Sequence, residues 1–143
     1  MIALRAWLAK YTSANRKRNI LSRVILIVDD EAGIRHFVRA ALEMAGYSVE
    51  EAGGSAEALR ILDHSQPQLL ITDIVMPEAN GFQLAALAHR HYPGLRVIFM
   101  TGYGAQYEEE LSGTVYLAKP FSIAGLLSAV ESAIGLPHGK AGG

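Results

Sequence analysis

Five polar side chains stand directly after short apolar runs in this sequence. Asp29 and Asp30 follow the run VILIV, and Asp73 follows LLIT. Thr101 comes after VIFM, and Lys119 comes after TVYLA. If these runs are parallel strands of one sheet, their carboxyl ends meet at the same edge. Three carboxylates, a hydroxyl and an ammonium are therefore expected to converge there.

This set of groups suits phosphoryl chemistry. Carboxylates that gather in one place repel one another, and a hard divalent cation compensates for that repulsion. Mg²⁺ takes few protein oxygens and keeps positions for water and phosphate, which fits so small a set. The ammonium and the hydroxyl would stabilise charge on the phosphoryl oxygens. Because a carboxylate that attacks phosphorus forms an acyl phosphate, the sequence predicts a phosphoryl-accepting aspartate beside Mg²⁺.

The elements that must position these groups alternate between strands and helices. Apolar runs predict strands over residues 24–28, 47–52, 69–72, 97–100 and 114–118. Apolar residues at helical spacing predict helices within residues 34–45, 55–62, 82–91 and 123–134. Ser55 is expected to cap the second of these helices. Continuous apolar strands separated by helices are typical of a parallel sheet covered on both faces, so we expect one open α/β domain.

Composition and charge narrow the class of protein. The 143 residues are 50% hydrophobic and 19% charged, which is typical of one folded domain. The absence of cysteine excludes disulfides and thiolate chemistry and fits a reducing compartment. No apolar run approaches the ~20 residues that cross a bilayer, and the first residues are a poor secretory signal, so we expect a cytoplasmic protein without a transmembrane segment.

The charge is unevenly distributed along the chain. Residues 1–23 carry six basic side chains and no acidic one, which leaves 7 basic and 14 acidic side chains for residues 24–143. The negative net charge of residues 24–143 argues against direct DNA binding by the domain. Leu4, Trp7, Leu8 and Tyr11 have the spacing of a short amphipathic helix. An untethered extension explains the same residues, and we favour it.

Four segments, VILIVDDE, LLITDIVMP, VIFMTGY and YLAKPF, resemble the four blocks that mark receiver domains of two-component response regulators. The resemblance spans residues 24–135. It implies a doubly wound, flavodoxin-like (βα)5 domain whose parallel sheet has the strand order 2-1-3-4-5. Residues 1–23 are then a basic N-terminal extension, and residues 136–143 are a flexible C-terminal tail.

The resemblance also assigns roles to the residues at the acidic edge. Asp73 would accept a phosphoryl group from a phosphohistidine on a sensor histidine kinase or a phosphotransfer protein. Asp30, Asp73 and the backbone carbonyl of Val75 would bind Mg²⁺ directly, and Asp29 would act through water. The protein would be a signalling switch, with self-phosphorylation and self-dephosphorylation as its only chemistry.

The resemblance further implies that Thr101 and Lys119 would hold the phosphoryl oxygens. Tyr116 resembles the family's aromatic switch, which turns inward when Thr101 moves; simple packing of an edge-strand aromatic is the alternative. The resemblance implies a cis peptide before Pro120. The switch would act on a downstream protein target, and a homodimer is left open.

Two departures from the family pattern bear on the output of the domain. Thr101 and Lys119 are only 18 residues apart, so we expect a shortened fourth helix, with Glu108–Glu110 on its remnant. The eight residues after Gly135 are too few for an effector module. We therefore expect either a stand-alone receiver that acts through protein contacts or one module of a longer protein.

Two other functions are weighed against this interpretation. An aspartyl phosphohydrolase would carry a second aspartate two residues after its nucleophile, where this chain has Val75. A phosphorylation-independent interaction domain would not need the intact set of phosphoryl-handling residues described above. Tyr103 lies two residues after the hydroxyl residue. Val75 and Tyr103 are together expected to hinder water and to slow dephosphorylation.

Overall fold

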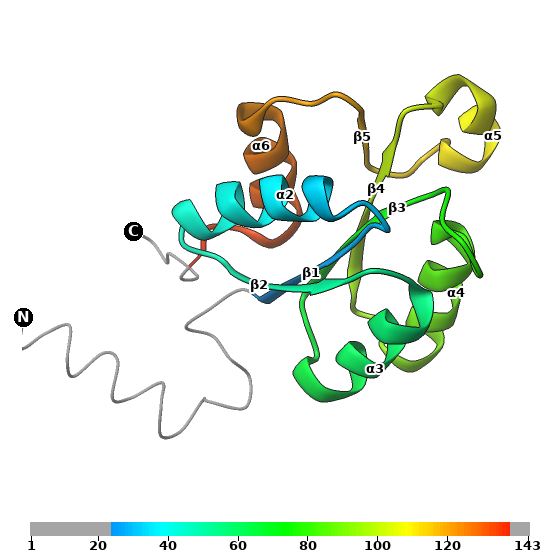
Figure 1. Ribbon diagram of the computed structural model, residues 1–143, viewed down its shortest axis with the longest axis horizontal. Coiled ribbons are helices and arrows are strands. Elements are labelled where there is room, and N and C mark those ends of the chain that lie inside the picture. Colours follow the sequence, from blue (N-terminus) through cyan, green and yellow to red (C-terminus); the bar gives the residue numbers. More distant parts are fainter. Residues whose placement is uncertain (1–23, 138–143) are drawn as a thin grey trace, which may run out of the picture.

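The computed structural model describes residues 24–137, and element labels follow Figure 1. Strands and helices alternate along the whole of this region. The elements in chain order are β1 (Val24–Val28), α2 (Ala32–Met44), β2 (Ser48–Ala52), α3 (Ser55–Ser65), β3 (Leu69–Asp73), α4 (Gly81–His91), β4 (Arg96–Thr101), the 3-10 helix η2 (Gly104–Tyr107), α5 (Glu108–Leu111), β5 (Tyr116–Ala118) and α6 (Ile123–Ile134).

The five strands form one parallel sheet in the order β2-β1-β3-β4-β5. Val28 at the end of β1 is level with Ala52 in β2 and with Thr72 in β3. Because the strand ends are level, the residues that follow them are brought to one edge. The predicted fold class and strand order are confirmed.

Helices cover both faces of the sheet, as Figure 1 shows. Successive residues of β1 enter opposite cores: Ile25 and Ile27 pack with residues of α2 and α6, whereas Leu26 and Val28 pack with residues of α3 and α4. This alternation explains why β1 is apolar at every position, since both of its faces are buried.

The predicted shortening of the fourth helix is confirmed, because only η2 and the four-residue α5 lie between β4 and β5. The last strand is shorter than the predicted 114–118. Thr114 instead closes the turn after α5, where its N–H and its hydroxyl both donate to the Leu111 carbonyl oxygen, at 2.9 and 2.8 Å.

The predicted cap of α3 is wrong. Gly54 is the N-cap residue, and Ser55 is already the first residue of the helix. No side chain of the described residues caps the start of α3, and the Ser55 hydroxyl donates to Glu78 at 3.5 Å. The predictions for the N-terminal extension and the C-terminal tail concern residues 1–23 and 138–143, which lie outside the described residues. No helix within residues 24–137 is long and apolar enough to span a membrane.

Candidate functional site

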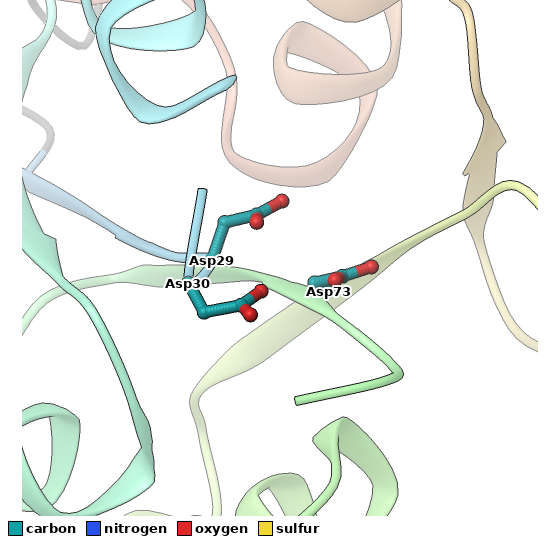
Figure 2. A group of neighbouring side chains, drawn as sticks. All are labelled: Asp29, Asp30 and Asp73. Atoms are coloured by element: carbon teal, nitrogen blue, oxygen red, sulfur yellow. The ribbon is translucent and has the colours of Figure 1, made fainter. Parts of the chain in front are cut away.

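Three carboxylates meet at the carboxyl edge of the sheet. Asp29 and Asp30 follow β1, Asp73 ends β3, and one oxygen from each lies within 4.8 Å of the others. Figure 2 shows the three side chains extending from two neighbouring strand ends toward one region. Asp29 is fully buried, Asp73 is 8% exposed, and Asp30 is exposed to solvent. The expected convergence of these residues is therefore observed, with one side open to water.

Lys119 lies between the two buried carboxylates. Its Nζ donates to Asp29 Oδ2 at 3.1 Å and to Asp73 Oδ1 at 3.3 Å. The lysine follows β5, its N–H donates to the Thr101 carbonyl at 2.8 Å, and its peptide bond to Pro120 is cis. One ammonium therefore faces two buried carboxylates and a third at the surface, which leaves the site negatively charged.

The pKa shifts describe the same imbalance. Burial raises the pKa of the Asp73 carboxyl and the Asp29 carboxylate raises it further, against the opposing effect of Lys119. Burial alone would lower the pKa of the Lys119 ammonium, but its contacts with Asp29 and Asp73 raise it above the ordinary value. The surroundings of Asp73 thus destabilise its ionised form. A hard divalent cation would offset this destabilisation of the charged carboxylate. An all-oxygen donor set with one open side fits Mg²⁺.

Thr101 ends β4 and is almost fully buried. Its hydroxyl oxygen accepts a hydrogen bond from the Tyr103 N–H at 2.8 Å, which leaves the hydroxyl proton available to donate. Thr101 lies beside the end of β3, because Asp73 pairs in register with Met100. A β-carbon placed on Gly104 would lie 3.9 Å from Thr101 Cγ2, so the start of η2 covers this side of the site.

Two further predicted site residues lie at the solvent boundary. Tyr116 is 45% exposed, and its ring lies against Gly104, where an added β-carbon would approach it to 3.5 Å. Val75 is 51% exposed in the loop after Asp73. The preceding residue, Ile74, accepts from the Gly81 N–H at 2.8 Å, which folds this loop back toward α4. The roles of Tyr116 and Val75 stay predictions.

Residues 25–131 match the model of the response regulator receiver domain. The chain belongs to this family. The response regulator receiver protein CpdR of Brucella abortus (strain 2308) is 36% identical over 111 residues, which cover 75% of this chain and 92% of that protein. The response regulator TrrA of Thermotoga maritima, solved in complex with Mg²⁺-BeF, gives a TM-score of 0.72 at 30% identity and covers 78% of this chain and 99% of its own.

Longer regulators also contain a similar receiver. The DNA-binding transcriptional regulator NtrC of Bradyrhizobium sp. (strain RP501 Parasponia) is 35% identical over 117 residues. That match covers 79% of this chain but only 24% of NtrC. The chain therefore spans about a quarter of that regulator, and the similarity concerns the receiver alone.

Gly81 is a site residue of this receiver that sequence reasoning missed. A β-carbon at this position would lie 2.3 Å from the Asp73 carbonyl oxygen, far inside van der Waals contact. Gly81 begins α4, whose N-cap Asn80 and third residue Gln83 form a reciprocal capping box. The helix start is thus held directly against the end of β3. The Asn-Gly pair that follows Asp73 in the sequence was the available signal, since glycine permits close backbone approach.

Arg35 was also missed. Its Nη1 donates to the Asp29 backbone carbonyl at 2.7 Å, and its Nε donates to Glu51 at 3.0 Å. Glu51 also accepts from Arg39 at 2.8 Å. Burial tends to raise the pKa of Glu51, but hydrogen bonds from Arg39 and Arg35 outweigh it and hold this pKa below its ordinary value. The position of Arg35, six residues after Asp29 on the next helix, was the only signal in the sequence.

Proposed function

We propose that this receiver accepts a phosphoryl group on Asp73 in a Mg²⁺-dependent reaction. The donor would be a phosphohistidine on a sensor histidine kinase or a phosphotransfer protein. The proposal rests on one observation above all: Lys119 Nζ bridges Asp29 and Asp73, at 3.1 and 3.3 Å, beside a third carboxylate. This arrangement pairs a nucleophilic carboxylate with a cation already in contact with it.

The side chains divide the work of the transfer. A carboxylate oxygen of Asp73 forms the new bond to phosphorus while the bond from phosphorus to the imidazole nitrogen breaks, and that nitrogen keeps the electron pair. The Lys119 ammonium remains near the acceptor and can donate to a phosphoryl oxygen. The Thr101 hydroxyl, whose oxygen is already held by the Tyr103 N–H, can donate its proton to another.

The cation fits beside these groups. Asp30, Asp73 and the Val75 carbonyl would hold Mg²⁺, and Asp29 would act through water. Bound Mg²⁺ supplies positive charge between the anionic acceptor and the anionic phosphoryl group. The related TrrA, which has been solved with Mg²⁺-BeF, supports this assignment.

The change in charge at Asp73 would be read on the β5 side of the domain. Thr101 would shift toward the phosphoryl group, and Tyr116 would turn inward into the space that Thr101 leaves. Tyr116 is suited to such a movement because its ring is 45% exposed and lies against a glycine. A downstream protein that contacts β5 and the short α5 would then distinguish the two states.

The acceptor can be tested with intact-mass measurements after incubation with acetyl phosphate and Mg²⁺. The parent protein should gain one phosphoryl group, and Asp73→Asn should gain none. Asp63→Asn is the matched control, because Asp63 lies on α3 and contacts Tyr92 rather than the site. It should be labelled like the parent. A label that persists in Asp73→Asn would refute the assignment.

A further inference from the structure

The Asp29–Asp30 peptide is held by Arg35. The Arg35 guanidinium donates to the Asp29 carbonyl oxygen through Nη1 at 2.7 Å, the shortest bond in this part of the site. The arginine comes from the first turns of α2, and its side chain is only 19% exposed. Because a peptide unit is planar, a fixed carbonyl also fixes the direction in which the chain continues into Asp30.

The Asp30 side chain has fewer contacts that fix its position than the Asp29 side chain has. Within residues 24–137, the Asp30 carboxylate makes no hydrogen bond or ion pair, and the residue is exposed. Asp29, by contrast, is fixed at its N–H by the Ala52 carbonyl and at its carboxylate by Lys119 and by the Glu31 N–H. The position of the Asp30 side chain therefore depends on its backbone, and Arg35 anchors that backbone on one side.

Arg35 adds little net charge to the acidic site. It pairs with Glu51, which is shared with Arg39, and Arg39 in turn pairs with Glu43. Two arginines and two glutamates thus alternate along α2 and β2. Since the charges of this group cancel, Arg35 can donate a hydrogen bond beside the carboxylates without strongly repelling a cation.

We propose that Arg35 positions Asp30 for cation binding by holding the Asp29–Asp30 peptide. This inference rests on the proposed Mg²⁺ site. Groups that orient metal ligands typically alter metal affinity by about 10–100-fold when they are removed. The sign of the effect separates positioning from simple electrostatics: loss of a nearby positive charge alone would strengthen Mg²⁺ binding, whereas loss of a positioning contact would weaken it.

Mg²⁺ affinity can be measured by NMR titration of the backbone amides of Asp30 and Asp73. Arg35→Met should raise the dissociation constant about tenfold. Arg39→Met is the matched control, since it removes one charge from the same group but contacts neither aspartate. Its dissociation constant should stay within about twofold of the parent, because exposed charges are well screened.

Phosphorylation gives a second readout that a general loss of stability would not produce. With acetyl phosphate as donor, Arg35→Met should need more Mg²⁺ for half-maximal rate but should approach the parent rate at saturating Mg²⁺. If Arg35→Met does not fold, Arg35→Lys carries the test against Arg39→Lys. Lysine lacks the planar fork of donors, so Arg35→Lys should weaken Mg²⁺ binding roughly threefold and Arg39→Lys should not.

The outcomes are distinct. Weaker binding in the Arg35 variants alone supports the proposal. Unchanged or tighter binding in the Arg35 variants, with normal binding in the parent, overturns the positioning role and leaves the proposed function intact. A parent protein that binds no Mg²⁺ overturns both.

Discussion

The two sides of the site are built differently. On the side of β1, β3 and α2, two of the three carboxylates are buried and hydrogen-bonded: Asp29 and Asp73 share Lys119, and Arg35 links the β1–α2 loop to β2. On the side of β4 and β5, the connection is a single 3-10 turn and a four-residue helix. Leu111 is the only buried residue of that connection, and Tyr116 is half exposed.

This difference separates two tasks within one small domain. In the proposed function, the acidic side would fix the geometry in which an acceptor, a cation and a phosphoryl group meet. The connection between β4 and β5 has few buried residues, so it can change conformation at small cost in free energy. We infer that the acidic side, together with Thr101 and Lys119 at the ends of β4 and β5, performs the chemistry, and that the connection between β4 and β5 reports it.

The largest expected difference between the two sides comes from adding one methyl group to a glycine on each. Gly81→Ala would place a β-carbon 2.3 Å from the Asp73 carbonyl, so it should destabilise the fold by roughly 2–3 kcal/mol. Gly104→Ala would bring its β-carbon to 3.5 Å from the Tyr116 ring and 3.9 Å from Thr101 Cγ2, which are ordinary van der Waals contacts, and should change stability by less than about 0.5 kcal/mol. Urea unfolding measures both. Equal losses would show that the β4–β5 side is as tightly packed as the acidic side.

Bound Mg²⁺ should raise the free energy of unfolding of the domain, and only residues of the acidic side should contribute to this gain. Burial and Asp29 raise the pKa of Asp73, so its ionised form opposes folding near neutral pH, and a bound cation should reverse this. At a Mg²⁺ concentration ten times the dissociation constant, the gain should be about 1.4 kcal/mol. Asp30→Ala should remove most of it, Asp29→Ala less, and Tyr116→Ala none. A melting temperature that does not change on addition of millimolar Mg²⁺ would contradict the proposed cation site.

The lifetime of the phosphoryl group should depend on residues at the boundary between the two sides. Val75 has no hydrogen-bonding side chain, and Tyr103 is large and 63% exposed. If the pair hinders in-line water, the parent should lose its phosphoryl group roughly threefold more slowly than a Val75→Asn, Tyr103→Glu variant, about 0.6 kcal/mol in barrier. Decay is followed after donor removal at constant Mg²⁺. Equal or faster decay in the parent would remove the shielding role.

The smallest effect on stability is expected at Tyr116. Tyr116→Ala should lower the free energy of unfolding by less than about 0.5 kcal/mol, because the residue is half exposed. It should leave the phosphorylation rate unchanged, because Tyr116 makes no hydrogen bond with Asp73. It should nevertheless reduce the change in the NMR signals of α5 and β5 on addition of Mg²⁺ and beryllofluoride. An identical spectral change in the variant would assign Tyr116 to packing alone.

The sheet and its acidic edge could be predicted from the sequence because both depend on local pattern. A strand buried on both faces is apolar at every position, and the pattern stops where polar residues begin, as at Asp29 and Asp73. The shortened fourth helix followed from chain length between Thr101 and Lys119. These features need no knowledge of distant contacts.

The rest depended on contacts between segments far apart in the chain. Arg35 reads as an ordinary helix arginine until α2 is placed beside Glu51 in β2. Gly81 reads as a turn residue until α4 is docked on the end of β3. Serine is a residue type that often caps helices. Here, however, Gly54 adopts the extended conformation of the N-cap residue of α3, and Glu78 accepts a hydrogen bond from the Ser55 hydroxyl.

Direct location of the phosphoryl group tests the central claim. An acyl phosphate is reduced by borohydride to an alcohol, so treatment after phosphorylation converts the acceptor aspartate to homoserine, which peptide mass mapping identifies. We predict conversion at Asp73 alone, dependent on Mg²⁺ during labelling. Conversion at Asp29 or Asp30, or no conversion in protein that binds Mg²⁺, would contradict the account.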